Sequence, residues 1–157
     1  MNKAMIWVKP MDTKNKIPYR FASILPVGIA IALETLPSGA VCVFAPNPTD
    51  RVRQTFSYFD LTPFGYANFG PFLTAIISCL LLAAVGIGLF RDGAGIRKLS
   101  LALSLASVIA SLLPLAFGIE YFTLTAAGIA LCLALEYAAL RIQNKQHKER
   151  RDVPVSD

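Results

Sequence analysis

Two acidic residues, Glu34 and Glu136, stand well inside the long apolar runs of this sequence. Little else in it could do chemistry. The one histidine, His147, lies among lysines and arginines near the C-terminus, and the three cysteines are scattered, with no CxxC pair and no glycine-rich phosphate loop. We therefore expect no catalytic site, no metal site and no cofactor, and we expect that the protein is not an enzyme.

Glu34 is predicted to belong to a polar layer within the membrane. Counted at about 1.5 Å per residue from the inner face, it lies roughly 20 Å up its run, and Ser78, Ser111 and Thr125 reach a similar level. Hydrocarbon penalises a carboxylate, so burial favours the neutral acid. Two interpretations stay open: a hydrogen-bonded structural acid, or a binding or proton-carrying group in a polar cavity.

Glu136 lies nearer the inner face, about 7 Å above Arg141 on the same scale and level with Ser104. We expect Ser104 and Glu136 to form an inner polar pair. Arg97, Lys98 or Arg141 is expected to hold Glu136, because long basic side chains can snorkel along apolar surface. The two acids lie at different heights, so they do not form a catalytic dyad.

Helical spacing predicts which faces of the last two apolar runs meet. One stripe holds Ser100, Ser104, Ser107 and Ser111, and another holds Tyr121, Thr125, Gly128, Cys132 and Glu136. Small and hydroxyl residues are the usual material of helix contacts in lipid, so we expect the stripes to face each other. Alanine ridges lie opposite them, at Ala102, Ala106 and Ala110 and at Ala126, Ala130, Ala134 and Ala138. We expect these ridges to point outward and to offer a helix interface for a homodimer or a larger membrane protein.

Transmembrane helices are the elements that must position these residues. Of the 157 residues, 55% are hydrophobic and 16% are charged, whereas an ordinary soluble domain has about 25% charged residues. Runs of about 20 apolar residues cross a bilayer, and four fit here: 21–40, 71–90, 99–117 and 119–140. The predicted fold is an all-α membrane protein with a four-transmembrane-helix bundle at 21–140. A basic arm at 1–20 precedes it, and a charged tail at 141–157 follows it.

The basic residues predict the orientation of this bundle. The arm holds five lysines and arginines, the loop at 91–98 holds three and the tail holds five, whereas the long first loop holds only Arg51 and Arg53. By the positive-inside rule, both termini are cytoplasmic and the protein is a multi-pass protein of the plasma membrane. A competing interpretation makes 21–40 a signal peptide, because Ser38, Gly39 and Ala40 resemble a cleavage site.

The outer loop at 41–70 is rich in β-branched and aromatic residues. Val41–Phe44 and Thr55–Phe59 flank a turn of Pro, Asn and Asp, which predicts a short β-hairpin. The candidate recognition residues of this loop are Tyr58, Asp60, Phe64, Tyr66 and Phe69. Aromatic rings settle at the headgroup level, so the loop is expected either to lie on the membrane as a lid or to bind a partner.

The layout of spans and loops resembles the claudin-type tetraspan arrangement, although the tryptophan and paired cysteines of the claudin loop are missing. The segment from Thr55 to Phe72 resembles uncharacterised small membrane proteins of bacteria. Neither resemblance carries a known active site, so no residue role follows from it.

We expect a non-enzymatic membrane protein, an interaction or accessory subunit that docks partners through its outer aromatic loop and its alanine-rich faces. The alternative is a small transporter or channel subunit that uses Glu34 in a polar cavity. The expected partners are the lipid bilayer and a second copy or a larger membrane protein. The positive charge is explained by topology, so no nucleic acid is expected.

Overall fold

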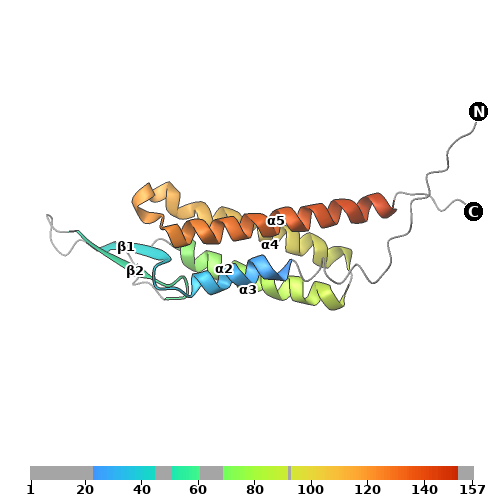
Figure 1. The fold of residues 1–157 in the computed structure, drawn as a ribbon, viewed down its shortest axis with the longest axis horizontal. Coiled ribbons are helices and arrows are strands. Elements are labelled where there is room, and N and C mark those ends of the chain that lie inside the picture. The colour runs from blue at the N-terminus through green and yellow to red at the C-terminus, as the bar shows by residue number, and fades with distance from the viewer. Residues whose placement is uncertain (1–22, 45–50, 61–68, 92, 152–157) are drawn as a thin grey trace, which may run out of the picture.

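Helices that lie side by side, with one β-hairpin at one end, make up the described part of this computed structural model (Figure 1). It describes residues 23–44, 51–60, 69–91 and 93–151. In chain order the elements are α2 (Ile24–Glu34), β1 (Ala40–Phe44), β2 (Val52–Phe56), α3 (Phe69–Phe90), α4 (Ala94–Phe117), a short 3-10 helix η2 (Ile119–Tyr121) and α5 (Leu124–Arg151).

Three of these helices are long and apolar enough to cross a membrane: α3, α4 and the Leu124–Lys148 stretch of α5. The prediction of membrane-spanning helices is confirmed for these three. The described α2 is apolar but has 11 residues. At about 1.5 Å per residue it covers roughly half of a hydrocarbon core about 30 Å thick.

The polar and apolar side chains are distributed as a membrane requires. All four serines of the predicted α4 stripe are buried, as are Thr74 and Ser78 of α3, whereas leucines such as Leu105, Leu112 and Leu131 are exposed. Large apolar side chains on the outside suit hydrocarbon, and hydroxyls inside are shielded from it. The inward orientation predicted for the serine stripe is confirmed.

Helix α2 packs against both α3 and α5, and α4 packs against α3 and α5. Helix α2 runs antiparallel to α5. At one end of α2, a Cβ placed on Gly128 would lie 3.4 Å from Leu33 Cδ1. At the other end, Gln143 Nε2 donates a hydrogen bond to Ser23 Oγ, 2.5 Å away. The C-terminus of α2 therefore lies beside the start of α5, at the hairpin end of the bundle (Figure 1).

The first helix ends at Glu34, so the prediction of a helix over 21–40 is wrong at its C-terminal end. Pro37 disfavours helical geometry at Leu36 and cannot donate a backbone hydrogen bond. Thr35 ends the helix, and its hydroxyl donates to the Ala32 carbonyl at 2.7 Å. The chain then turns through residues 35–39 and enters β1 at Ala40.

The hairpin is present, but its second strand lies earlier than predicted. β2 covers Val52–Phe56 and pairs antiparallel with β1, with Ala40 opposite Phe56 and Phe44 opposite Val52. The predicted Thr55–Phe59 strand fails after Phe56, because Ser57 bonds locally: its N–H donates to Asp60 Oδ2 at 2.8 Å. Such side-chain bonds compete with strand pairing.

The boundaries of the last two helices also differ from the predicted runs. Helix α4 begins at Ala94 rather than 99, and α5 begins at Leu124 rather than 119 and continues to Arg151. The predicted break at Gly118 is confirmed. Gly118 has a φ of 132°, which a residue with a side chain rarely adopts, and the η2 turn follows.

The alanine ridge of α5 does not point outward along its whole length. Ala126 is buried in the core beside Ile129, whereas Ala130 is half-buried and only Ala134 and Ala138 are exposed. Ala110 of the α4 ridge is buried as well. The prediction is wrong for Ala126, because α5 packs against both α2 and α4, and for Ala110, because α4 packs against both α3 and α5. Each helix therefore buries a wider face than one stripe.

Ala126 and Ala134 provide a matched pair for testing this placement. We expect Ala126→Leu to lower stability by about 1–3 kcal/mol, because added methylenes overpack a filled core. Ala134→Leu should leave stability within about 0.5 kcal/mol, because leucine suits a lipid-facing position. Thermal unfolding of both variants in the same detergent is the measurement. Equal losses in the two variants would contradict the placement.

Candidate functional site at the hairpin end of the bundle

Glu34 places a carboxyl group inside the bundle at the C-terminal end of α2. The residue is fully buried. Its Oε1 accepts a 2.8 Å hydrogen bond from Ser78 Oγ of α3, and its Oε2 has no hydrogen-bond partner among the described residues. The predicted association of Glu34 with Ser78 is therefore present in the structure.

The backbone of Glu34 fastens the hairpin to the helices. Its carbonyl accepts hydrogen bonds from the Tyr58 N–H and from Ser57 Oγ, both at 2.9 Å. The last carbonyls of a helix lack partners within the helix, and here the segment after β2 supplies them. One residue thus ends α2, buries a carboxyl group and seats the hairpin.

Tyr58 is buried against the turn that follows α2. Its side chain is 1% exposed, and its ring lies so close to Gly39 that a Cβ there would be 2.9 Å from two ring carbons. Its hydroxyl has no hydrogen-bond partner within the described part of the chain. Burial, and secondarily the charge of Glu34, raise the pKa of the Tyr58 phenol. Only glycine at position 39 allows this close approach.

Two further bonds join the turn after α2 to the start of α5. Thr123 Oγ1 donates to the Gly39 carbonyl at 3.0 Å and accepts from the Ala126 N–H at 3.0 Å. Thr123 is therefore the N-cap of α5. The hydroxyls of Ser38 and Thr125 are 3.0 Å apart and share a hydrogen bond.

The rest of the predicted polar layer does not gather around Glu34. Ser111 is buried, but its hydroxyl donates to the Val108 carbonyl of its own helix at 2.8 Å. Thr125 bonds to Ser38 instead. The site that the structure brings together consists of Glu34, Ser78 and Tyr58.

The predicted recognition residues of the outer loop are placed differently from one another. Tyr58 is buried, so its prediction as a recognition residue is wrong: the ring packs on Gly39. Asp60 is exposed, with Oδ2 bonded to the Ser57 N–H, and Phe69 is exposed in the first turn of α3. Phe64 and Tyr66 lie outside the described residues.

The inner pair is buried without the predicted bonds. Ser104 Oγ donates to the Leu101 carbonyl at 2.9 Å, and neither oxygen of Glu136 has a hydrogen-bond partner among the residues that the structure describes. Arg141 does not hold Glu136. Its guanidinium lies 5.9 Å from the centre of the Tyr137 ring and donates to the Tyr137 hydroxyl at 3.1 Å.

The sequence pattern did not predict Gly39, Ser57 and Thr123 as parts of this site. Thr123 carries a local signal, a threonine just before an apolar helix, which is typical of an N-cap. Within the described ranges, no group of three or more His, Cys, Asp or Glu residues could hold a metal ion.

Comparison of the chain with protein-family models, with curated proteins and with solved structures finds no match.

The buried carboxyl group predicts unequal effects for two substitutions. Glu34→Gln keeps an acceptor for Ser78 and should cost about 1 kcal/mol. Glu34→Lys places an ammonium group without a partner among apolar side chains and should cost about 3 kcal/mol or prevent folding. The yield of monodisperse protein and its thermal unfolding measure the difference. Glu120→Lys, at an exposed position of η2, is the control for the charge change and should fold normally. Equal losses in Glu34→Gln and Glu34→Lys would contradict the placement of Glu34.

Proposed function

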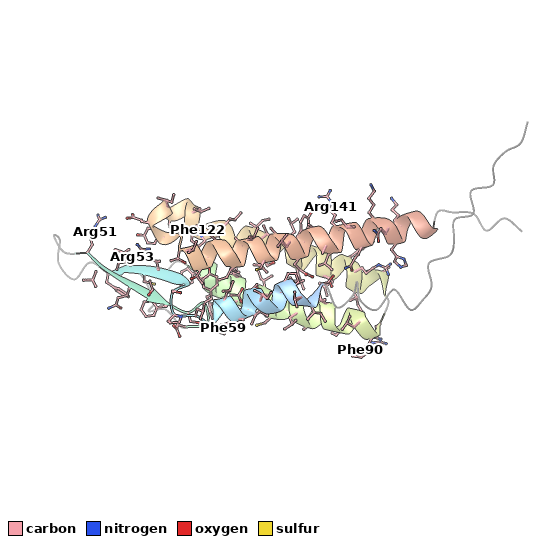
Figure 2. The ribbon with its side chains drawn as sticks, viewed as in Figure 1. Arg51, Arg53, Phe59, Phe90, Phe122 and Arg141 are labelled. Carbon is pink, nitrogen blue, oxygen red and sulfur yellow. The ribbon has the colours of Figure 1, made fainter. Side chains whose placement is uncertain are left out.

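We propose that the chain is a four-span protein of the bacterial plasma membrane, with its termini in the cytoplasm and its hairpin outside. Figure 2 supports this orientation: Arg51 and Arg53 lie on the hairpin, whereas Arg141 lies toward the opposite end of the bundle. The turn between α3 and α4, with its basic residues, also lies at that opposite end (Figure 1). In the sequence, 13 of the 15 lysines and arginines fall in the arm, the 91–98 loop and the tail, and two fall in the loop after α2, which favours a cytoplasmic location for the first three segments.

In that membrane we infer a non-enzymatic role, as an accessory subunit that binds a partner outside the membrane through the hairpin. The observation that carries this proposal is the exposure of β2: Val52, Arg53, Gln54 and Thr55 are all exposed, on a hairpin that extends beyond the helix ends (Figure 1). A two-stranded hairpin is marginally stable alone. This one is held at its base by Tyr58 and Glu34.

The exposed strand suits a partner of definite chemistry. A strand with a free edge can accept an extended segment of another protein, and Arg51 and Arg53 add positive charge there. Complementary charge speeds and orients such encounters. The proposed partner therefore presents an extended, acidic segment. The exposed Ala134 and Ala138 offer a separate place for close helix packing, with a second copy or a larger membrane protein.

A small transporter or channel subunit is the second candidate function. Its support is the buried Glu34 carboxyl group, which has one oxygen without a partner among the described residues. Intramembrane acids are commonly functional. A hydrated path beside Glu34 would favour this candidate over the accessory role.

A photo-crosslinking amino acid at position 54 tests the accessory role. Gln54 is exposed on β2, so we expect protein adducts in native membranes when the probe replaces it. The matched control is position 131, because Leu131 is exposed on an apolar span and its probe should meet lipid. Substituting Arg51 and Arg53 by glutamate should reduce the adduct at position 54 about tenfold or more, through charge repulsion. A probe at position 54 that captures no protein under any growth condition would refute the proposed docking surface.

The orientation is tested separately by cysteine labelling in intact cells. In a variant without the three native cysteines, a cysteine at position 53 should react with an impermeant maleimide, because the hairpin is outside. A cysteine at position 148 should react only after the cells are opened. The reverse pattern would overturn the orientation.

A further inference from the structure

The Glu34 carboxyl group and the Tyr58 hydroxyl are two buried polar groups where the base of the hairpin meets the end of α2. Glu34 is fully buried and Tyr58 is 1% exposed. The Tyr58 backbone N–H is bonded to the Glu34 carbonyl at 2.9 Å. Glu34 Oε2 and the Tyr58 hydroxyl each lack a hydrogen-bond partner in the described part of the chain. Buried polar atoms of this kind call for an explanation.

The groups around Glu34 determine what it can bind. The segment after β2 contributes Tyr58 and, beyond it, Asp60, which is exposed and bonded to Ser57. Helix α3 contributes Ser78 and its neighbour Cys79, which is exposed. The titratable groups that α5 carries before Tyr137 are Cys132 and Glu136, and both lie deeper in the bundle than Gly128, which contacts Leu33.

No lysine or arginine occurs in α2, in α3 or in α5 before Arg141, so no cation from these helices neutralises the carboxylate. A metal ion such as calcium needs six to eight oxygen ligands, and this site offers one carboxyl group and two hydroxyls. A buried carboxyl group with a single donor and no cation is stable in its protonated form. The ligand that this donor set fits is a proton.

On the helix side, the Glu34 carboxyl group is bonded to Ser78 of α3. On the hairpin side, the Glu34 backbone is bonded to Tyr58, whose ring is buried against Gly39. We call this ring the lid. The residues next to this lid, Leu36, Ser38 and Phe59, are exposed. A small displacement of Tyr58 would therefore connect Glu34 with the water at this end of the bundle.

We propose that Glu34 is a proton-binding site that exchanges with the outer aqueous phase past Tyr58, and that loss of its proton loosens the hairpin. The carboxylic acid gives its proton to a water molecule and becomes a carboxylate. Water then enters to solvate the carboxylate, because Ser78 alone cannot do so. The Tyr58 ring moves to admit this water. The hairpin is seated while the proton is bound and loosens as the pH rises. This inference rests on the contacts at the end of α2 and does not require that the hairpin binds a partner.

Hydrogen exchange at the hairpin base, measured against pH, tests the coupling. The readout is the Tyr58 amide, which is bonded to Glu34, in full-length wild type and in Glu34→Gln and Glu136→Gln variants. After correction for intrinsic exchange, the wild type should lose protection by about tenfold or more as the pH rises. Glu34→Gln, which has no proton to lose, should show a flat profile. Glu136→Gln, the matched buried acid away from the hairpin, should follow the wild type. Identical pH profiles in the wild type and Glu34→Gln would overturn the proposal.

Infrared spectroscopy tests proton binding without altering Glu34. In the Glu136→Gln variant, pH-difference spectra should show one carboxylic C=O stretch in an apolar environment that disappears as the pH rises. Replacing Tyr58 by alanine in that background removes the lid, and the band should then disappear at a lower pH because water reaches the carboxylate. A spectrum without any titrating band of this kind would overturn the assignment of Glu34 as an exchangeable proton site.

Discussion

Hydrocarbon offers no hydrogen-bond partner, and this constraint shapes the three helices that are long and apolar enough to cross a membrane. A polar side chain that faces lipid would lose its bonds to water and gain none. The hydroxyls of Thr74, Ser104, Ser107 and Ser111 accordingly point inward, and each donates to a carbonyl of its own helix. Leucine and isoleucine take the outer faces. The small inward side chains also let the helices approach closely, which is the main source of helix association in lipid.

The contacts at the hairpin end of the bundle also follow from the need of polar groups for hydrogen-bond partners. A two-stranded hairpin cannot bury enough surface to stand alone, and the end of α2 needs partners for its carbonyl groups. The hairpin and the end of α2 stabilise each other, because Ser57 and Tyr58 donate hydrogen bonds to the Glu34 carbonyl. Thr123 joins the same junction while it caps α5. The hairpin is thereby fastened to Glu34, the residue that carries the buried carboxyl group.

The sequence predicted what depends on local pattern and missed what depends on neighbours. The run at 71–90 matches α3, and the serine period gave the correct buried face of α4, because both follow from composition and the helical repeat. The alanine ridge of α5 was wrongly predicted to be exposed at Ala126, because periodicity cannot show that α2 and α4 both pack against this helix. Tyr58 looked like a surface aromatic, and only its contact with Gly39 shows otherwise. Arg141 lies over the ring of Tyr137 and does not bond to Glu136. Both residues are close to Arg141 in the sequence, and spacing alone does not decide between them.

A polar interior and an apolar exterior are what a membrane-embedded bundle requires, and spin-label accessibility along α4 measures both directly. Single labels would replace Leu105, Ile109 and Leu112 on the exposed face and Ser104, Ser107 and Ser111 on the buried one. In lipid bilayers, the first three should collide readily with dissolved oxygen and rarely with a water-soluble nickel chelate. The last three should be shielded from both reagents. Strong nickel contact at Leu105, Ile109 and Leu112 would place that face in water and contradict the account.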